Sequence, residues 1–132
     1  MKVEIMNGAM LAFVGDAYYE LKVRQMLMER SINKPKKFHQ LAVFYVCAKA
    51  QAKVLQQLIE ADYLTETELS VVRRGRNVNS GTVPKHTVVR IYRQSTAFEA
   101  LIGYLYLNED FQRLNEVISH CIELRRKDEE NE

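Results

Sequence analysis

Apolar residues recur at helical spacing along nearly the whole chain, and no segment alternates apolar and polar positions as a half-buried β-strand does. The spacing predicts a first helix over residues 9–29 and, after a linker rich in turn residues, a long amphipathic helix over residues 38–61. A short third helix is expected from Glu66, because the segment 65–68 (Thr-Glu-Thr-Glu) is a capping-box signature. Gly75 lies where this helix should stop.

The second half of the chain continues the helical pattern after one interruption. Residues 76–86 contain Gly, Pro, Asn and Ser without an apolar period, so they predict a loop of about ten residues. Thr87 can cap the next helix, whose core-facing positions include Phe98 and Leu105, and a last helix is expected over residues 110–126. Together these elements predict an all-α domain.

Composition narrows the class of protein without indicating a function. A chain of 132 residues with 47% hydrophobic and 27% charged residues is long enough for one soluble globular domain. Its longest apolar stretch, around residues 101–107, is far shorter than the roughly 20 residues of a membrane span, and the N-terminus shows no secretory signal pattern. Cys47 and Cys121 lack metal-ligand spacing, so we expect two reduced thiols in a cytoplasmic protein.

Charge is distributed unevenly, although the formal net charge is only +2. No acidic residue occurs over residues 69–98 or over residues 30–59. These two stretches carry the candidates for binding a polyanion, which are Arg73, Arg74, Arg76 and Lys85 in the first and Lys34, Lys36 and Lys37 in the second. A merely solvated basic surface would explain the same pattern. Residues 127–132 hold four acidic residues and one lysine, so we expect a domain over residues 1–126 and a frayed acidic tail.

Two carboxylates interrupt otherwise apolar helical segments, and each has a glycine nearby. Gly15 precedes Asp16, and Gly103 lies four residues after Glu99, on the same helical face. If the two helices cross at their glycines, the carboxylates come close together and need a proton or a divalent cation between them. Oxygen ligands favour Mg²⁺ or Mn²⁺, which would suit hydrolysis of a phosphodiester. The spacing alone is equally compatible with two carboxylates on unrelated surface faces.

The segments around these carboxylates resemble the two signature stretches of ribonuclease III endonuclease domains. The matching segments are 13–17 (Phe-Val-Gly-Asp-Ala) and 96–107 (Thr-Ala-Phe-Glu-Ala-Leu-Ile-Gly-Tyr-Leu-Tyr-Leu). Further motifs at 18–20, 48–52 and 73–77 extend the similarity to about residues 9–124 and to the Mini-ribonuclease III members, which have a catalytic domain without a double-stranded-RNA-binding domain. The resemblance implies the ribonuclease III endonuclease fold of about five to seven helices.

The resemblance also implies an activity. Asp16 and Glu99 match the catalytic, metal-binding carboxylates of the family, with Mg²⁺ or Mn²⁺ as cofactor. The family acts as a homodimer in which each protomer cuts one strand of double-stranded RNA, and it matures large-subunit ribosomal RNA precursors. A ribosomal protein or pre-ribosomal particle is therefore a candidate partner, and no membrane is expected.

The chain departs from the larger ribonucleases III at two acidic positions, which are Ala12 and Thr96 here. Thr96 and Glu20 are candidates for outer-shell contacts to the metal, although Glu20 better suits a solvent-facing or hydrogen-bonding position. Because the catalytic domain must hold RNA by itself, the expected duplex-binding residues are Arg73, Arg74, Arg76, Lys85, Lys36 and Lys37.

Two rival functions fit parts of the pattern. The missing acids suit a catalytically inactive ribonuclease III fold that binds RNA as a structural protein. An all-α, metal-dependent nucleotide pyrophosphohydrolase also uses carboxylates, but it needs several at helical spacing, and only Asp16 and Glu20 approach that arrangement. Cleavage of RNA with and without metal would separate these functions.

Overall fold

The structure is a computed structural model that describes residues 2–78 and 88–132, and every regular element within these ranges is helical. The elements are a 3₁₀ turn η1 (Val3–Ile5) and the helices α1 (Gly8–Met28), α2 (Pro35–Val46), α3 (Ala48–Glu60), α4 (Glu66–Arg76), α5 (Val89–Leu107) and α6 (Phe111–Glu130). The all-α prediction and the expected number of helices are confirmed.

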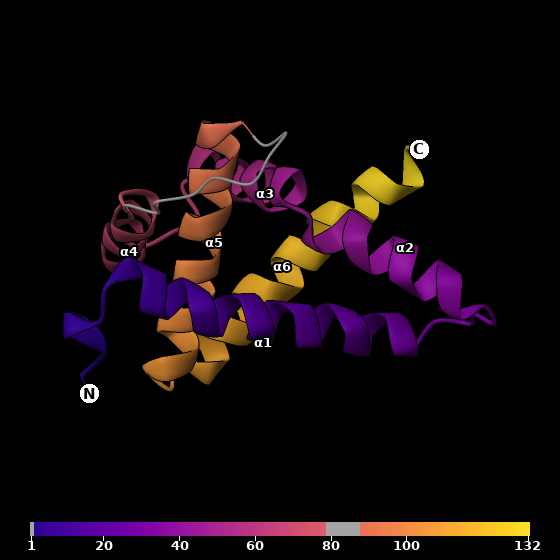
Figure 1. Cartoon of the computed structure of the whole chain (residues 1–132), viewed down its shortest axis with the longest axis horizontal. Coiled ribbons are helices and arrows are strands. Elements are labelled where there is room, and N and C mark those ends of the chain that lie inside the picture. Colours follow the sequence, from indigo (N-terminus) through magenta and orange to yellow (C-terminus); the bar gives the residue numbers. More distant parts are fainter. Residues whose placement is uncertain (1, 79–87) are drawn as a thin grey trace.

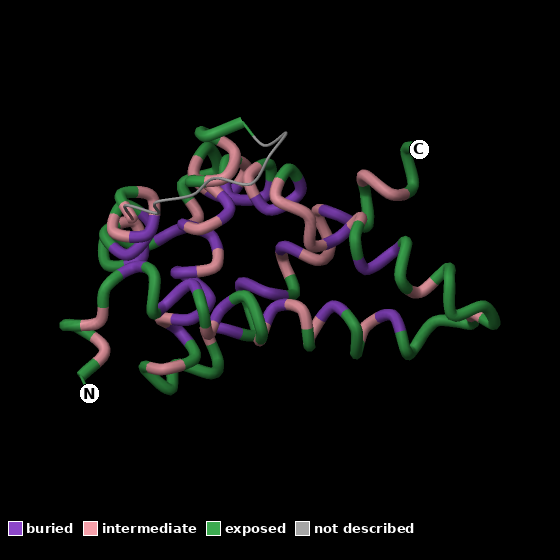
Figure 2. Tube along the Cα trace, in the orientation of Figure 1, coloured by how far each residue is buried: buried purple, intermediate pink, exposed green. Residues whose placement is uncertain are grey.

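Helix α5 is the centre of the fold. α1 runs along the long axis of the molecule and α5 crosses it, with α3 and α4 packed on α5. α2 packs against α1, and α6 crosses α1 obliquely (Figure 1). Buried residues line the surfaces where these helices meet, and exposed residues mark the outer side of α1 (Figure 2). The rings of Tyr19 and Phe98, both fully buried, pack edge to face with centroids 4.8 Å apart, so α1 and α5 share one core.

Glycines allow α1 and α5 to touch backbone to backbone. A Cβ atom on Gly15 would lie 1.7 Å from the carbonyl oxygen of Glu99, and a Cβ atom on Gly103 would lie 1.8 Å from the carbonyl oxygen of Leu11. No other residue fits at either position without moving a helix. The predicted crossing at these two glycines is therefore confirmed.

The prediction that α4 stops at Gly75 is correct to within one residue, since the helix ends at Arg76, and Gly75 has the same role between α4 and α5 as the other two glycines have between α1 and α5. It lies inside α4, where a Cβ atom would come within 2.8 Å of the Cα atom of Ala97. The capping box at the start of α4 is present as predicted, with the Thr65 hydroxyl accepting from the Glu68 amide and the Glu68 carboxylate accepting from the Thr65 amide.

The long helix predicted over residues 38–61 is also wrong, because the chain breaks at Cys47 into α2 and α3. Cys47 is extended (φ −62°, ψ 160°), which frees carbonyl groups of the last turn of α2. Arg125 of α6 satisfies one of them, with Nη2 donating to the carbonyl oxygen of Phe44 at 2.7 Å. The apolar pattern of the sequence continues through Cys47, so its periodicity does not reveal the break between the two helices.

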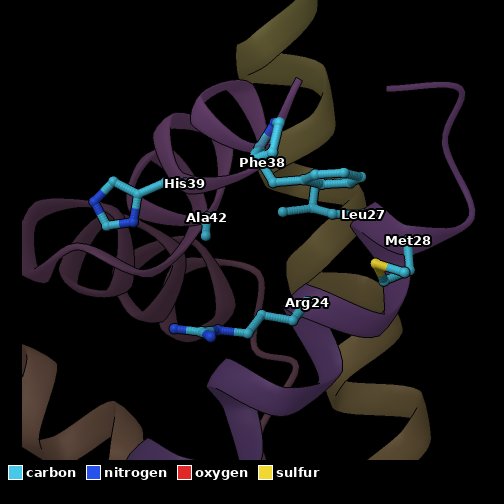
Figure 3. Close-up of a pocket in the computed structure, with 7 residues that line it drawn as sticks. Arg24, Leu27, Met28, Phe38, His39 and Ala42 are labelled. Atoms are coloured by element: carbon cyan, nitrogen blue, oxygen red, sulfur yellow. The ribbon is translucent and has the colours of Figure 1, made fainter. Parts of the chain in front are cut away.

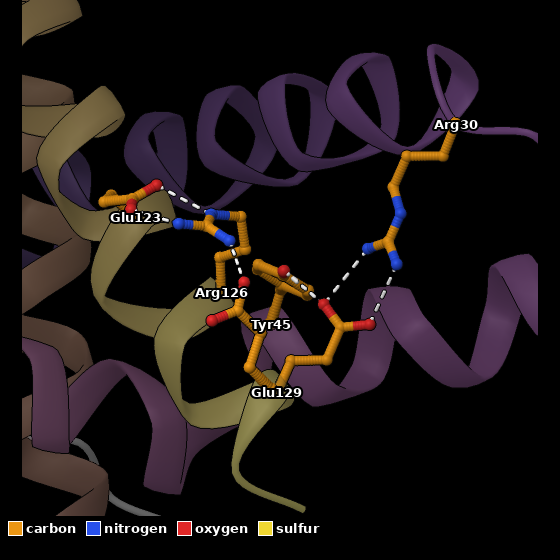
Figure 4. A network of polar contacts seen from close by, with 6 residues as sticks. Arg30, Tyr45, Glu123, Arg126 and Glu129 are labelled. Carbon is orange, nitrogen blue, oxygen red and sulfur yellow. Dashed lines mark hydrogen bonds and ion pairs between the residues drawn. The ribbon is translucent and has the colours of Figure 1, made fainter.

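The acidic end of the chain is ordered rather than frayed, since α6 continues to Glu130. Asp128 pairs with Lys53 and Arg125 at 2.9 Å each, and Glu129 accepts from Arg30 at 3.0 Å and from the Tyr45 hydroxyl at 2.6 Å (Figure 4). The expected tail thus supplies counter-charges that tie α6 to the first three helices.

Two smaller expectations concern α5 itself and the segment before it. α5 is continuous through residues 94–96, and its N-cap is Val88, which makes no side-chain capping bond. Thr87 and most of the predicted loop over residues 76–86 lie outside the described residues, while Arg76 is still helical.

None of the described helices is long and apolar enough to span a membrane.

Candidate active site

The crossing of α1 and α5 brings Asp16 and Glu99 to one cavity of about 310 Å³. It lies between the first half of α1, the end of α4 and the first half of α5. The residues that line it are Ala9, Ala12, Phe13, Asp16, Gly75, Val78, Tyr92, Arg93, Thr96 and Glu99. The two carboxylates therefore share one site, and the alternative of unrelated surface faces is excluded.

The pKa of the Glu99 carboxyl group is shifted far above its usual value. Burial raises the pKa of Glu99 to about 9, and a hydrogen bond and like charge from Asp16 act in the same direction, while a hydrogen bond from Gln51 opposes them. Two carboxyl groups this close cannot both be ionised at neutral pH unless a cation offsets their charge.

The donor set fits a hard divalent cation with few protein ligands. No group of three or more His, Cys, Asp or Glu side chains suited to holding a metal occurs in the described ranges. Mg²⁺ commonly takes one or two carboxylates and completes its octahedron with waters and phosphate oxygens. Asp16 and Glu99 are the residues that would hold it here.

Gln51 is a site residue that the sequence pattern did not reveal. It lies on the inner face of α3 with the buried residues Ala50, Val54 and Leu55, and it acts on Glu99 by hydrogen bonding that lowers the pKa of that carboxyl group. A buried amide is favourable only when it has a polar partner. The sequence feature that could have identified Gln51 is a single polar residue on an otherwise apolar helix face.

The two candidates for outer-shell contacts are placed differently. Thr96 lines the cavity, and its hydroxyl donates to the carbonyl oxygen of Tyr92 at 3.1 Å. Glu20 is absent from the cavity lining. Its Oε2 atom lies 3.4 Å from Nε of Arg24, on the next turn of α1. Of the two, the structure brings only Thr96 to the carboxylate pair.

The candidate RNA-binding residues are scattered. Arg73 is exposed, whereas Nη1 of Arg74 donates to the carbonyl oxygen of Met6 at 2.8 Å and holds the N-terminal segment. Nε of Arg76 donates to Gln94 at 2.8 Å. Lys36 and Lys37 are exposed in the first turn of α2, near the C-terminal end of α1, and Lys85 lies outside the described residues.

A second hollow of about 330 Å³ lies between the C-terminal half of α1 and α2 (Figure 3). Its lining consists of Arg24, Leu27, Met28, Pro35, Phe38, His39 and Ala42. It shares no residue with the carboxylate cavity, and no acidic side chain faces it. The chemistry that the sequence predicts therefore belongs to the cavity at the helix crossing.

Residues 9–110 match the model of the ribonuclease III domain, a span that includes both carboxylates and both crossing glycines. The chain belongs to the ribonuclease III family. It is 46% identical to Mini-ribonuclease 3 of Streptococcus pneumoniae over 92% of this chain and 94% of that protein. It is 44% identical to Mini-ribonuclease 3 of Enterococcus faecalis over 89% of each chain.

A solved structure supports the same assignment of fold. A protein from Fusobacterium nucleatum superposes with a TM-score of 0.79 and 29% sequence identity, covering 90% of this chain and 93% of that one. The predicted ribonuclease III endonuclease fold is confirmed, and the relatives place the chain with the Mini-ribonuclease 3 members of the family.

Proposed function

We propose that this protein is a metal-dependent endoribonuclease that hydrolyses phosphodiester bonds in double-stranded RNA. The observation that carries the proposal is the meeting of Asp16 and Glu99 in one cavity at the glycine crossing of α1 and α5. Membership of the ribonuclease III family supports the same reaction. With Mg²⁺ or Mn²⁺ bound, the site gains a water of lowered pKa and a positive charge beside the phosphate.

The chain's own residues prepare the site for this chemistry. The backbone contact at Gly15 and Gly103 fixes the separation of the two carboxylates, because neither helix can slide without a clash. Gln51 favours the ionised form of Glu99, because its hydrogen bonding lowers the pKa of that carboxyl group, and the Thr96 hydroxyl donates to the carbonyl oxygen of Tyr92 in its own helix. Among the residues that the structure describes, Asp16 and Glu99 are then the only acidic ones lining the cavity, so an entering phosphate meets little repulsion once a cation is bound.

A homodimer is part of the proposal, since one cavity can cut only one strand. Phe13 lines the cavity and is 82% exposed, and Met10 and Leu21 are further exposed apolar residues of α1. Burying such residues against a second copy about a two-fold axis would set two cavities on one duplex.

The biological substrate is proposed from the family resemblance. We infer that the duplex is a large-subunit ribosomal RNA precursor, processed in the cytoplasm, with a ribosomal protein or pre-ribosomal particle as a candidate partner. The inactive, RNA-binding alternative is disfavoured because both carboxylates face one cavity with a donor set that suits Mg²⁺.

The deciding experiment compares the wild type with Asp16→Asn and Glu99→Gln on an end-labelled duplex RNA, in Mg²⁺ and in chelator. Each variant is expected to lose cleavage by at least about a thousandfold, because half of the protein's metal ligands lose their charge. Circular dichroism checks that the helices remain. Wild-type rates in either variant, or cleavage by the wild type in chelator, would contradict the proposed site.

A further inference from the structure

A groove lined by three arginines lies beside the carboxylate cavity. It has a volume of about 540 Å³ and runs between α3, the end of α4 and the first turns of α5. Arg76, Arg90 and Arg93 line it together with Gln56, Asn77 and Gln94. No acidic side chain of the described ranges 2–78 and 88–132 takes part in the lining, so the groove is a concentrated positive site.

The charges of these arginines are not neutralised within the protein. Arg24, Arg30, Arg113, Arg125 and Arg126 all form ion pairs with carboxylates. Within residues 2–78 and 88–132, Arg76, Arg90 and Arg93 form none, and the chain's acidic residues all fall in these ranges. The acid-free stretch 69–98 is the cause in the sequence. Three uncompensated guanidinium groups in one groove favour a polyanion.

The groove is also built to hold its arginines in place. Nε of Arg76 donates to Oε1 of Gln94 at 2.8 Å, which orients the guanidinium and leaves its terminal nitrogens for a ligand. Arg90 and Arg93 are three residues apart on α5 and therefore lie on one side of the helix. Arg93 lines the carboxylate cavity as well, so the groove and the cavity are continuous at this residue.

We infer that Arg76, Arg90 and Arg93 bind the phosphate backbone of one RNA strand as it leaves the active site, with Arg93 contacting the phosphate next to the one that is cut. The inference rests on the proposed function and adds the course of the substrate strand. Guanidinium groups bind phosphate oxygens with paired hydrogen bonds, and duplex RNA is recognised mainly through its backbone. The neighbouring Arg74 is excluded from this role because it bonds the carbonyl oxygen of Met6.

The test measures binding separately from cleavage. The affinity for a fluorescent duplex RNA is measured in chelator at several salt concentrations, for the wild type and for Arg76→Ala, Arg90→Ala and Arg93→Ala. Each variant is expected to bind about tenfold more weakly and to lower the slope of log affinity against log salt by about 0.9. Arg126→Ala is the matched control, because Arg126 lies on α6 and is paired with Glu123 and Glu130.

Cleavage in Mg²⁺ then tests the special position of Arg93. Arg90→Ala is expected to raise KM alone, whereas Arg93→Ala should also lower kcat, and Arg93→Lys should restore affinity more than kcat. Salt slopes equal to that of the wild type in all three variants would overturn the groove, even if the wild type cleaves duplex RNA. A wild type that fails to cleave, while the variants still lose slope, would overturn the nuclease proposal and leave the groove intact.

Discussion

At the scale of single residues, the site depends on two glycines, which have no side chain, as much as on the two carboxylates. Gly15 and Gly103 lack a Cβ atom, and this lets the backbones of α1 and α5 touch and sets Asp16 beside Glu99. The sequence indicated this arrangement because a glycine and a carboxylate recurred together in two apolar helices. It did not indicate Gln51, whose partner lies 48 positions away, at Glu99.

Replacement of Gln51 by leucine tests its role as a positioning residue. Gln51→Leu keeps the volume but removes the hydrogen bond that orients Glu99, so about 10–100-fold more Mg²⁺ should be needed for half-maximal cleavage. A Mg²⁺ titration of the cleavage rate measures this shift. Gln57→Leu is the control on the same helix, since the Oε1 atom of Gln57 is buried without a hydrogen-bond partner. Equal Mg²⁺ requirements in both variants would contradict the role.

At the scale of elements, ion pairs with α6 fix helices that carry the site. Arg113 of α6 reaches the start of α4, where it donates to both carboxylate oxygens of Glu68 and to the carbonyl oxygen of Tyr63, each at 2.8 Å. Glu68 is also the capping-box residue of α4. The start of α4, the helix that brings Gly75 and Arg76 to the cavity and the groove, is thus held by one half-buried ion pair.

Breaking this pair should destabilise the protein in a pH-dependent way. Burial tends to raise the pKa of Glu68, but the hydrogen bonds from Arg113 and Thr65 outweigh it and hold that pKa below its usual value. The resulting stability is present above the unfolded-state pKa of about 4.3 and is lost as the pH falls through the lower folded value. Arg113→Met should therefore lower the free energy of unfolding by about 2–3 kcal/mol at pH 7.

Urea unfolding at pH 7 and at pH 3 measures both parts of this prediction. The difference between the wild type and Arg113→Met should be smaller at pH 3, which lies below the unfolded-state pKa, because protonation of Glu68 weakens its pairing with Arg113. Arg126→Met is the control, because the pairs that Arg126 makes on α6 are exposed. A difference that is the same at both pH values would rule out Glu68 as its source.

At the scale of the whole molecule, the proposed homodimer would depend on the exposed face of α1, because a two-fold interface there would bring two of the cavities together. Phe13 projects from this face at the edge of the cavity, with most of its ring in solvent. An exposed aromatic ring beside a catalytic cavity is costly for a monomer and favourable for a symmetric dimer.

Phe13→Ser is therefore expected to shift the protein from dimer to monomer in sedimentation velocity at micromolar concentration. The same variant should nick single strands of a duplex more often than it cuts both, because the two cavities no longer act together. Met28→Ser is the matched control, since Met28 is 72% exposed near the other end of α1. A Phe13→Ser protein that remains dimeric would place the interface elsewhere.

The sequence by itself determined the all-α class, most of the helical segments and the pair of carboxylates. These features are local: helical periodicity, a capping box and a glycine beside an acid are all visible within one or two turns. Resemblance to the ribonuclease III family added the prediction that Asp16 and Glu99 are catalytic, metal-binding carboxylates.

Only the tertiary structure decided the features that join distant parts of the chain. Arg125 stabilises the break at Cys47, Arg30 and Lys53 pair with the acidic end of α6, and the hydrogen bonding of Gln51 acts on Glu99. It also separated Arg74, which bonds the N-terminal segment, from Arg76, which faces a groove. Such pairings depend on which helices pack together, and periodicity along one helix carries no information about its neighbours.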